Sequence, residues 1–113
     1  MNDCLFCKIA AGEIPSAKVY EDDYVCAFHD IDKKAPVHVL IIPKKHIASI
    51  SETPEEDMGI FSDIMSVAKK LAAEFNLSDG FRIVVNTGKN GGQSVPHLHF
   101  HLLGGRQLAW PPG

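Results

Sequence analysis

Three of the six histidines in the chain lie close together near its C-terminal end: His97, His99 and His101. Three large apolar residues alternate with them: Leu98, Phe100 and Leu102. Because successive side chains of a β-strand point to opposite faces, this spacing predicts a strand with all three imidazoles on one face. Neighbouring imidazoles on such a face lie about 6.6 Å apart. Histidine serves as nucleophile, base and metal ligand, so this face is a candidate reactive site.

An imidazole beside a phosphate group can attack the phosphorus atom and form a covalent intermediate, which divides one difficult displacement into two easier ones. The attacking nitrogen must carry no proton, so a partner on the other ring nitrogen has to fix the tautomer. Neighbouring histidines and backbone groups could supply that partner and stabilise charge on the phosphoryl group. The spacing leaves open which of the three histidines attacks.

A glycine-rich segment at 86–94 precedes the histidines and reads Asn-Thr-Gly-Lys-Asn-Gly-Gly-Gln-Ser. Glycine allows backbone N–H groups to converge on an anion, and Ser94 adds a hydroxyl donor. Because Ser94 precedes His97 by three residues, the segment is interpreted as a phosphate-binding loop beside the imidazoles. A surface loop without a ligand is the alternative.

Cys4 and Cys7 form a C-x-x-C pair, which supplies half of a tetrahedral zinc site. His46 and His97 could supply the other half and complete a structural Cys₂His₂ set. A redox-active dithiol and two thiols buried against the core remain the alternatives.

Composition limits the class of protein. The 113 residues suit one domain, expected over 1–113, and the formal net charge is −3. The lysines form scattered doublets rather than a basic stripe, so no nucleic acid is expected as a partner. No apolar run approaches the roughly 20 residues of a membrane span, and no membrane partner is expected. The odd cysteine count and the absence of a basic, apolar leader favour a reducing, cytoplasmic location.

Hydrophobic patterning predicts two helices and five strands. The strands are expected at 18–21, 24–29, 37–42, 81–86 and 97–103, mostly with short connections. A short helix over 4–11 ends at Gly12. One long helix and antiparallel strands indicate an α+β fold.

The long helix is expected to begin at Thr53 as N-cap, with Pro54 at its first position and Glu56 closing a capping box. A core-facing stripe follows at helical spacing: Phe61, Ile64, Met65, Ala68, Leu71, Ala72 and Phe75.

Four further residues have simpler interpretations. His29 is expected to form a local hydrogen bond, and His38 has no notable spacing. Cys26 is interpreted as a small core residue. Trp110 lies in a Pro-Pro tail that cannot continue a strand, so it could cover a pocket or dock on another subunit; a disordered chain end is the alternative.

The chain resembles the histidine-triad family, whose signature is His-x-His-x-His followed by apolar residues. Further segments resemble its nucleotide-binding branch: Phe28-His29-Asp30-Ile31, Ile42-Pro43-Lys44-Lys45-His46-Ile47, Val84-Val85-Asn86, Gly91-Gly92-Gln93-Ser94-Val95, Gly104-Gly105-Arg106-Gln107 and Trp110-Pro111-Pro112-Gly113. The cysteine pair resembles a zinc-bearing bacterial subgroup, in which the matching histidines are His46 and His97. Pro96, directly before the triad, departs from the pattern.

The resemblance implies a homodimer in which two five-stranded sheets merge into one of ten strands. It implies hydrolysis of purine nucleoside phosphoramidates, such as adenylate linked to lysine, with His99 as the transiently adenylylated nucleophile. His101 and Ser94 match phosphate contacts, beside His97 as a neighbour of the nucleophile. The matching nucleotide contacts are Asp30, Ile31, Asn86, Gly92 and Gln93. The tail 104–113, with Trp110, resembles one that reaches the neighbouring subunit's site.

Two other functions remain open at this point. The first is a zinc hydrolase in which the three triad histidines themselves hold the metal, as three-histidine catalytic sites do. The second is a dimer that senses nucleotides or binds proteins without an enzymatic role.

Overall fold

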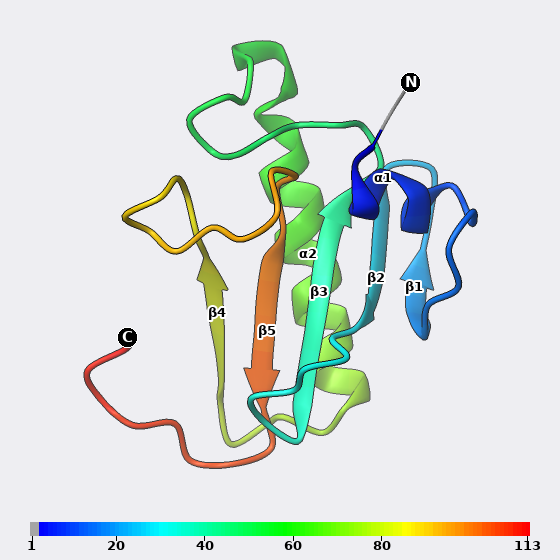
Figure 1. The fold of residues 1–113 in the computed structure, drawn as a ribbon. Helices are drawn as coiled ribbons and strands as arrows, with labels where there is room; N and C mark the ends of the chain where they lie inside the picture. Colours follow the sequence, from blue (N-terminus) through cyan, green and yellow to red (C-terminus); the bar gives the residue numbers. More distant parts are fainter. Residues whose placement is uncertain (1–2) are drawn as a thin grey trace.

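The computed structural model describes residues 3–113 as a five-stranded antiparallel sheet with a helix against each face (Figure 1). The elements in chain order are α1 (Leu5–Ala10), β1 (Lys18–Glu21), β2 (Val25–His29), β3 (Val37–Pro43), a 3₁₀ turn (Glu55–Asp57), α2 (Gly59–Glu74), β4 (Phe81–Val85) and β5 (Phe100–Gly104). The strand order is β1-β2-β3-β5-β4, so β5 lies between β3 and β4, and β4 lies at an edge. The predicted α+β class and five antiparallel strands are confirmed.

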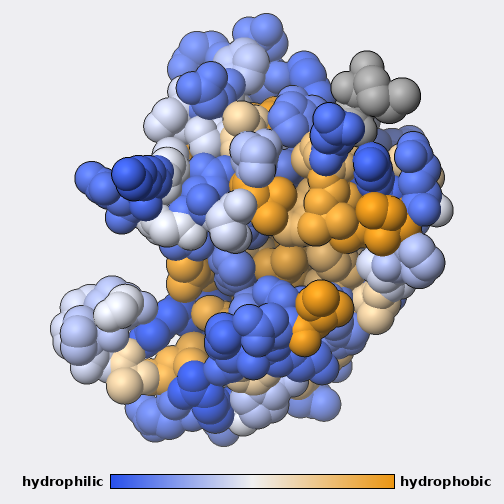
Figure 2. All heavy atoms as spheres, viewed as in Figure 1, coloured by the Kyte–Doolittle hydropathy of each residue, from blue (hydrophilic) through white to orange (hydrophobic). Residues whose placement is uncertain are grey.

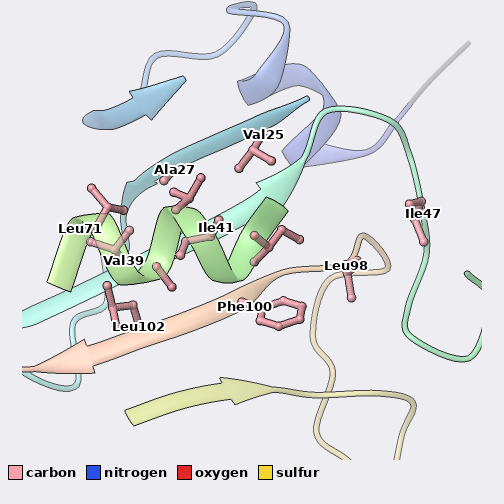
Figure 3. Packing of buried hydrophobic residues seen from close by; sticks show 12 residues of the cluster. Val25, Ala27, Val39, Ile41, Ile47, Leu71, Leu98, Phe100 and Leu102 are labelled. Atoms are coloured by element: carbon pink, nitrogen blue, oxygen red, sulfur yellow. The ribbon is translucent and has the colours of Figure 1, made fainter. Parts of the chain in front are cut away.

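The larger hydrophobic core lies between the sheet and α2. Figure 3 shows Leu98, Phe100 and Leu102 on the same side as Val39 and Ile41, facing α2. From α2 itself, the buried residues are Ile64, Val67, Ala68, Leu71 and Ala72. The apolar half of the alternating histidine segment therefore anchors the segment to the core, as the pattern predicts.

A smaller cluster holds α1 against the opposite face of the sheet. Phe6 and Ile9 of α1 pack there on Phe28 and Leu40. The helix is short, and the Cys4 sulfur accepts a hydrogen bond from the Cys7 amide at its start. Six residues are too few for a stable isolated helix, so side-chain packing and the residues at its N-terminus must hold it.

Two predictions about the long helix are wrong. Thr53 does not cap it, because its hydroxyl donates to the Ser49 carbonyl oxygen, and α2 begins only at Gly59 after the 3₁₀ turn. Met65, which was predicted to face the core, is 45% exposed. Val67, which was not predicted to face the core, is buried there instead. The other four buried residues of α2, Ile64, Ala68, Leu71 and Ala72, belong to the predicted stripe.

The histidine strand also begins later than predicted, at Phe100. The backbone N–H of Leu98 bonds to the Ile47 carbonyl oxygen, and that of His97 bonds to the Val95 carbonyl oxygen, so this stretch lies outside the sheet ladder. The alternation of faces is nevertheless kept, with Leu98 in the α2 core and the rings of His97 and His99 beside Phe6 of α1.

Within residues 3–113, no helix combines the length and the apolar character that a membrane crossing requires.

Candidate functional site

His99 is held in one orientation by its own backbone segment. Its Nδ1 atom lies 2.7 Å from the His97 carbonyl oxygen, and the ring is only 4% exposed. Because a carbonyl oxygen can only accept, Nδ1 carries the proton and Nε2 keeps its lone pair. Phe6 meets the ring edge-on, with centroids 5.1 Å apart. The ring therefore presents an unprotonated nitrogen, as a nucleophile requires.

His101 is held by a residue that sequence reasoning missed. The register of β3 and β5 pairs Leu40 with His101, so His38, two residues along β3, points to the same face. His38 Nε2 lies 2.9 Å from His101 Nδ1 and 3.4 Å from a carboxylate oxygen of Asp30. The spacing of His38 in the chain carries no signal of this contact. Only the strand register could have revealed it.

The Lys34 amide fixes the proton positions in this pair. It donates to His38 Nδ1 at 3.0 Å, which leaves the His38 proton on Nε2. His38 Nε2–H then donates to His101 Nδ1, so the His101 proton lies on Nε2. His101 thus offers a hydrogen-bond donor beside the bare nitrogen of His99, since the two rings are 5.1 Å apart.

Burial keeps these rings neutral. Desolvation lowers the pKa of His101 to about 4, with smaller contributions from His99 and His38. Desolvation also lowers the pKa of His38, against the opposing effect of the Asp30 carboxylate. At neutral pH both rings therefore carry one proton each, as the hydrogen-bond chain requires.

A pocket of about 950 Å³ opens beside these rings on the α1 side of the sheet. Of the predicted nucleotide contacts, the residues that line it are Asp30, Ile31, Asn86, Ser94, His99 and His101. Its apolar wall includes Phe6, Ile9 and Phe28. Figure 2 shows apolar surface gathered across the middle of this face. An apolar wall facing a few polar groups is the usual form of a small-molecule site.

The glycine-rich loop is built differently from the prediction. The amide of Gly92 donates to the Lys89 carbonyl oxygen, and that of Gly88 donates to the Gln93 side chain. The Gln93 side-chain nitrogen donates to the carbonyl oxygens of Ala48 and Val95. These N–H groups are used to fold the loop, and neither Gly92 nor Gln93 lines the pocket. Asn86 and Ser94, at its two ends, do.

The structure brings together the four predicted metal ligands, named here the Cys/His cluster: Cys4, Cys7, His46 and His97. His97 Nδ1 lies 3.2 Å from the Cys4 sulfur, 3.4 Å from the Cys7 sulfur and 3.2 Å from His46 Nδ1. A tetrahedral zinc ion would separate its sulfur and nitrogen ligands by about 3.5 Å and two nitrogens by about 3.3 Å. The cluster fits such an ion, and it could hold a metal.

His97 belongs to both the cluster and the reactive segment. Its Nε2 donates to the Pro43 carbonyl oxygen at 2.9 Å, so its Nδ1 carries the lone pair that faces the cluster. Its own carbonyl oxygen holds His99. Burial lowers the pKa of His97, which also favours the neutral ring that a metal ligand needs.

The three triad rings do not face a common point. The nitrogens of His97, His99 and His101 are directed respectively to the Cys/His cluster, to a backbone carbonyl and to His38. In the described part of the chain, the other group able to hold a metal is Asp30, His38 and His101. The geometry therefore gives no support to a metal held by the triad.

Trp110 lies apart from the pocket, whereas His29 contributes to its lining. Trp110 is 82% exposed in the tail, whose Ala109 carbonyl oxygen accepts a hydrogen bond from Arg82. The prediction that the His29 side chain forms a local hydrogen bond is wrong. Its buried Nδ1 has no partner among residues 3–113, and its ring packs edge-on against Phe75 on the α2 side.

Comparisons with known proteins agree with this geometry. A model of the HIT domain matches residues 11–108. A HIT-like protein of Synechococcus elongatus is 50% identical over 99% of this chain and 98% of its own length. The crystal structure of a HIT family hydrolase from Legionella pneumophila is 54% identical, covers 98% of this chain and 100% of that one, and superposes with a TM-score of 0.96.

A histidine triad nucleotide-binding protein from Candida albicans is 38% identical, covers 98% of this chain and 85% of that one, and has a TM-score of 0.81. The fold is thus that of a HIT family hydrolase with a nucleotide-binding architecture. The family match spans most of the chain, and a relative that is 50% identical aligns over 99% of it. The chain therefore belongs to the HIT family.

Proposed function

We propose that the chain hydrolyses purine nucleoside phosphoramidates, such as adenylate joined to the amine of lysine, through a nucleotidyl group carried on His99. The observation that carries this proposal is the hydrogen bond from His99 Nδ1 to the His97 carbonyl oxygen, which leaves Nε2 free to attack. The pocket in front of the ring gives the substrate a place to bind.

The reaction runs in two displacements at phosphorus. The His99 Nε2 lone pair forms a bond to the α-phosphorus, the phosphorus–nitrogen bond breaks, and the amine leaves with one proton taken up. Water then attacks the phosphorus atom, the bond to His99 breaks, and the nucleoside monophosphate leaves as one proton is released. His101 Nε2–H and the Ser94 hydroxyl donate hydrogen bonds to the phosphoryl oxygens, where charge accumulates.

We place the parts of the nucleotide in the pocket by the chemistry of its lining. The apolar wall of Phe6, Ile9 and Phe28 suits a purine ring, together with the exposed Ile31. The Asp30 carboxylate suits the ribose hydroxyl groups as an acceptor. Asn86 and the folded loop that Gly92 and Gln93 maintain then close the phosphate end.

The Cys/His cluster is proposed to hold one zinc ion in a structural role. Two sulfur and two nitrogen ligands saturate a tetrahedral ion, which leaves no position for water or substrate. The ion supplies rigidity: it ties α1, with its pocket residues Leu5 and Phe6, to the segment that carries His97.

The active form is proposed to be a homodimer. The edge strand β4 pairs with β5 on one side only within the described residues, and a second copy pairing there would extend the sheet to ten strands. The exposed Trp110 would then reach from the tail 104–113 toward the neighbouring subunit's pocket.

The proposal is tested with His99→Ala and an AMP–lysine phosphoramidate. Loss of a covalent nucleophile lowers kcat by about 10⁴-fold or more. The dissociation constant for AMP, measured by calorimetry, should stay within about threefold of wild type, because the apolar wall and Asp30 remain. Met65→Ala is a control, since that side chain is 45% exposed on α2 and does not line the pocket, and it should keep its turnover.

Retained turnover in His99→Ala would reject the nucleophile. A wild-type protein that binds AMP but hydrolyses no phosphoramidate would favour the nucleotide-sensing alternative. Immediate loss of turnover on chelation, with unchanged AMP binding, would favour metal-dependent hydrolysis.

A further inference from the structure

The exposed side chain of Arg106, just after β5, contacts the loop that organises the reactive histidines. Its guanidinium donates to the Lys34 carbonyl oxygen at 2.9 Å. Lys34 lies in an irregular loop between β2 and β3, and the amide of the same residue donates to His38 Nδ1. One side chain on the tail thus holds the residue that fixes the tautomer of His38.

We propose that Arg106 is a positioning residue, which acts through the Lys34 backbone to keep the His38 proton on Nε2 and hence the His101 proton on Nε2. The hydrogen bonds run in one direction. Arg106 donates to Lys34, Lys34 donates to His38, and His38 donates to His101 at 2.9 Å. The last ring, His101, lines the pocket.

The chain is built so that this contact can form. Gly105 has a φ of 91°, a left-handed conformation that lets the backbone turn toward the loop. A Cβ at position 105 would lie 2.9 Å from Cβ of Pro36, so only glycine lets the tail approach this closely. The Lys34 side chain donates to Asp32, and the Lys34 carbonyl oxygen accepts from Arg106.

Loss of the Lys34 contact allows these hydrogen bonds to reverse in part of the molecules, because the Asp30 carboxylate, 3.4 Å from His38 Nε2, still favours a proton there. If the amide moves away, His38 Nδ1 is free to take the proton, and His38 Nε2 then offers a lone pair to His101. His101 Nδ1 then carries the proton and donates it to His38 Nε2. His101 Nε2 is left without a proton, so it presents a lone pair instead of a donor to the pocket. The phosphoryl oxygens then lose a hydrogen bond that strengthens as charge develops. This consequence for catalysis rests on the proposed function, whereas the tautomer itself does not.

The test compares three variants of the full chain: Arg106→Met, Arg106→Lys and Arg82→Met. Methionine keeps the length of the side chain without a donor, and lysine restores a donor. Arg82→Met is the matched control, because it removes the other arginine-to-carbonyl contact of the tail without touching Lys34. Two-bond ¹H–¹⁵N spectra of the histidine rings, without substrate, show which nitrogen of each ring carries the proton.

We expect His38 to be a single Nε2–H tautomer in the wild type, a mixture in Arg106→Met, and a single tautomer again in Arg106→Lys and in Arg82→Met. With substrate, Arg106→Met should lower kcat about tenfold with KM within about twofold, the pattern of a lost transition-state interaction. Arg106→Lys should recover most of that loss.

An unchanged His38 tautomer in Arg106→Met overturns the proposal whatever the activity. A mixture that also arises in Arg82→Met overturns it too, because the effect is then a general loosening of the tail. A shifted tautomer with unchanged kcat overturns the catalytic consequence. A wild type without turnover rejects the proposed function instead, and the spectra still decide on Arg106.

Discussion

His97 and His99 share a hydrogen bond that joins two chemically different sites. The His97 carbonyl oxygen accepts from His99 Nδ1 at 2.7 Å, while the His97 ring faces the sulfur atoms of Cys4 and Cys7. The backbone of one residue thus orients the proposed nucleophile, and its side chain belongs to the Cys/His cluster. Because the His97 carbonyl oxygen holds the His99 ring, a cluster that fixes His97 also restricts the orientation of His99.

Loss of the proposed zinc ion should therefore weaken nucleotide binding as well as stability. A Cys4→Ser, Cys7→Ser double variant should lose one zinc ion per chain in elemental analysis. At free zinc near 100 times its dissociation constant, the lost stabilisation is about 3 kcal/mol. The AMP dissociation constant should rise, because α1 carries part of the apolar wall.

Cys26→Ala is the control for the metal content. Cys26 is buried in the smaller core and is not one of the four cluster residues, so this variant should keep its zinc. Full zinc content in the double variant would place the ion elsewhere and contradict the assignment.

Acid should destabilise the fold in a defined window. The pKa of His101 is about 4 in the folded chain and about 6.5 in an unfolded one. Between these values the unfolded state binds more protons, so the free energy of unfolding falls as the pH drops from about 6.5 to 4. The lowered pKa of His38 acts in the same direction.

Urea midpoints measured at several pH values, at equal metal load, check this dependence. His101→Gln removes the titrating ring and should flatten the slope across the window. Equal slopes in wild type and variant would show that the acid sensitivity arises elsewhere.

Two positions on α2 should respond very differently to alanine. Leu71 is fully buried, and Leu71→Ala should lower the free energy of unfolding by about 2–5 kcal/mol. Met65 is 45% exposed, and Met65→Ala should change it by less than about 0.5 kcal/mol. Urea unfolding of both variants measures the difference, and similar losses would contradict the observed helix face.

These positions also show what the sequence could predict. The alternation through 97–103 correctly assigned the faces of the histidine segment, because burial follows the two-residue period of an extended chain even where the ladder is absent. The cysteine and histidine types, with zinc chemistry, brought the four cluster residues together correctly. On α2, the predicted stripe matched the buried face at Ile64, Ala68, Leu71 and Ala72, but it included the exposed Met65 and left out the buried Val67.

Contacts made by strand register and by the backbone lay beyond the sequence. His38 meets His101 because β3 and β5 pair in one register, which no local pattern encodes. The glycine-rich loop suggested free N–H groups, but the Gly88 N–H donates to the Gln93 side chain and the Gly92 N–H donates to the Lys89 carbonyl oxygen. The sequence after Thr53 suits a helix cap, but the Thr53 hydroxyl donates to the Ser49 carbonyl oxygen instead of capping α2.

The oligomer should be a dimer whose subunits share their sites. Light scattering should give twice the 12.4 kDa chain mass. Trp110→Ala should lower turnover without changing that mass. Co-expressed Trp110→Ala and His99→Ala chains should form mixed dimers with one intact site, and their turnover should exceed the mean of the two separate variants. Turnover equal to that mean would contradict a shared site.

The most direct test of the proposed chemistry is to trap the intermediate. The wild-type protein is mixed with an AMP–lysine phosphoramidate, quenched within the first turnover, measured as intact mass and mapped by peptide fragmentation under conditions that preserve phosphoramidate bonds. We predict one nucleotidyl group per chain, carried on His99 and absent from His99→Ala. Rapid turnover without any adduct, or an adduct on another residue, would contradict the account.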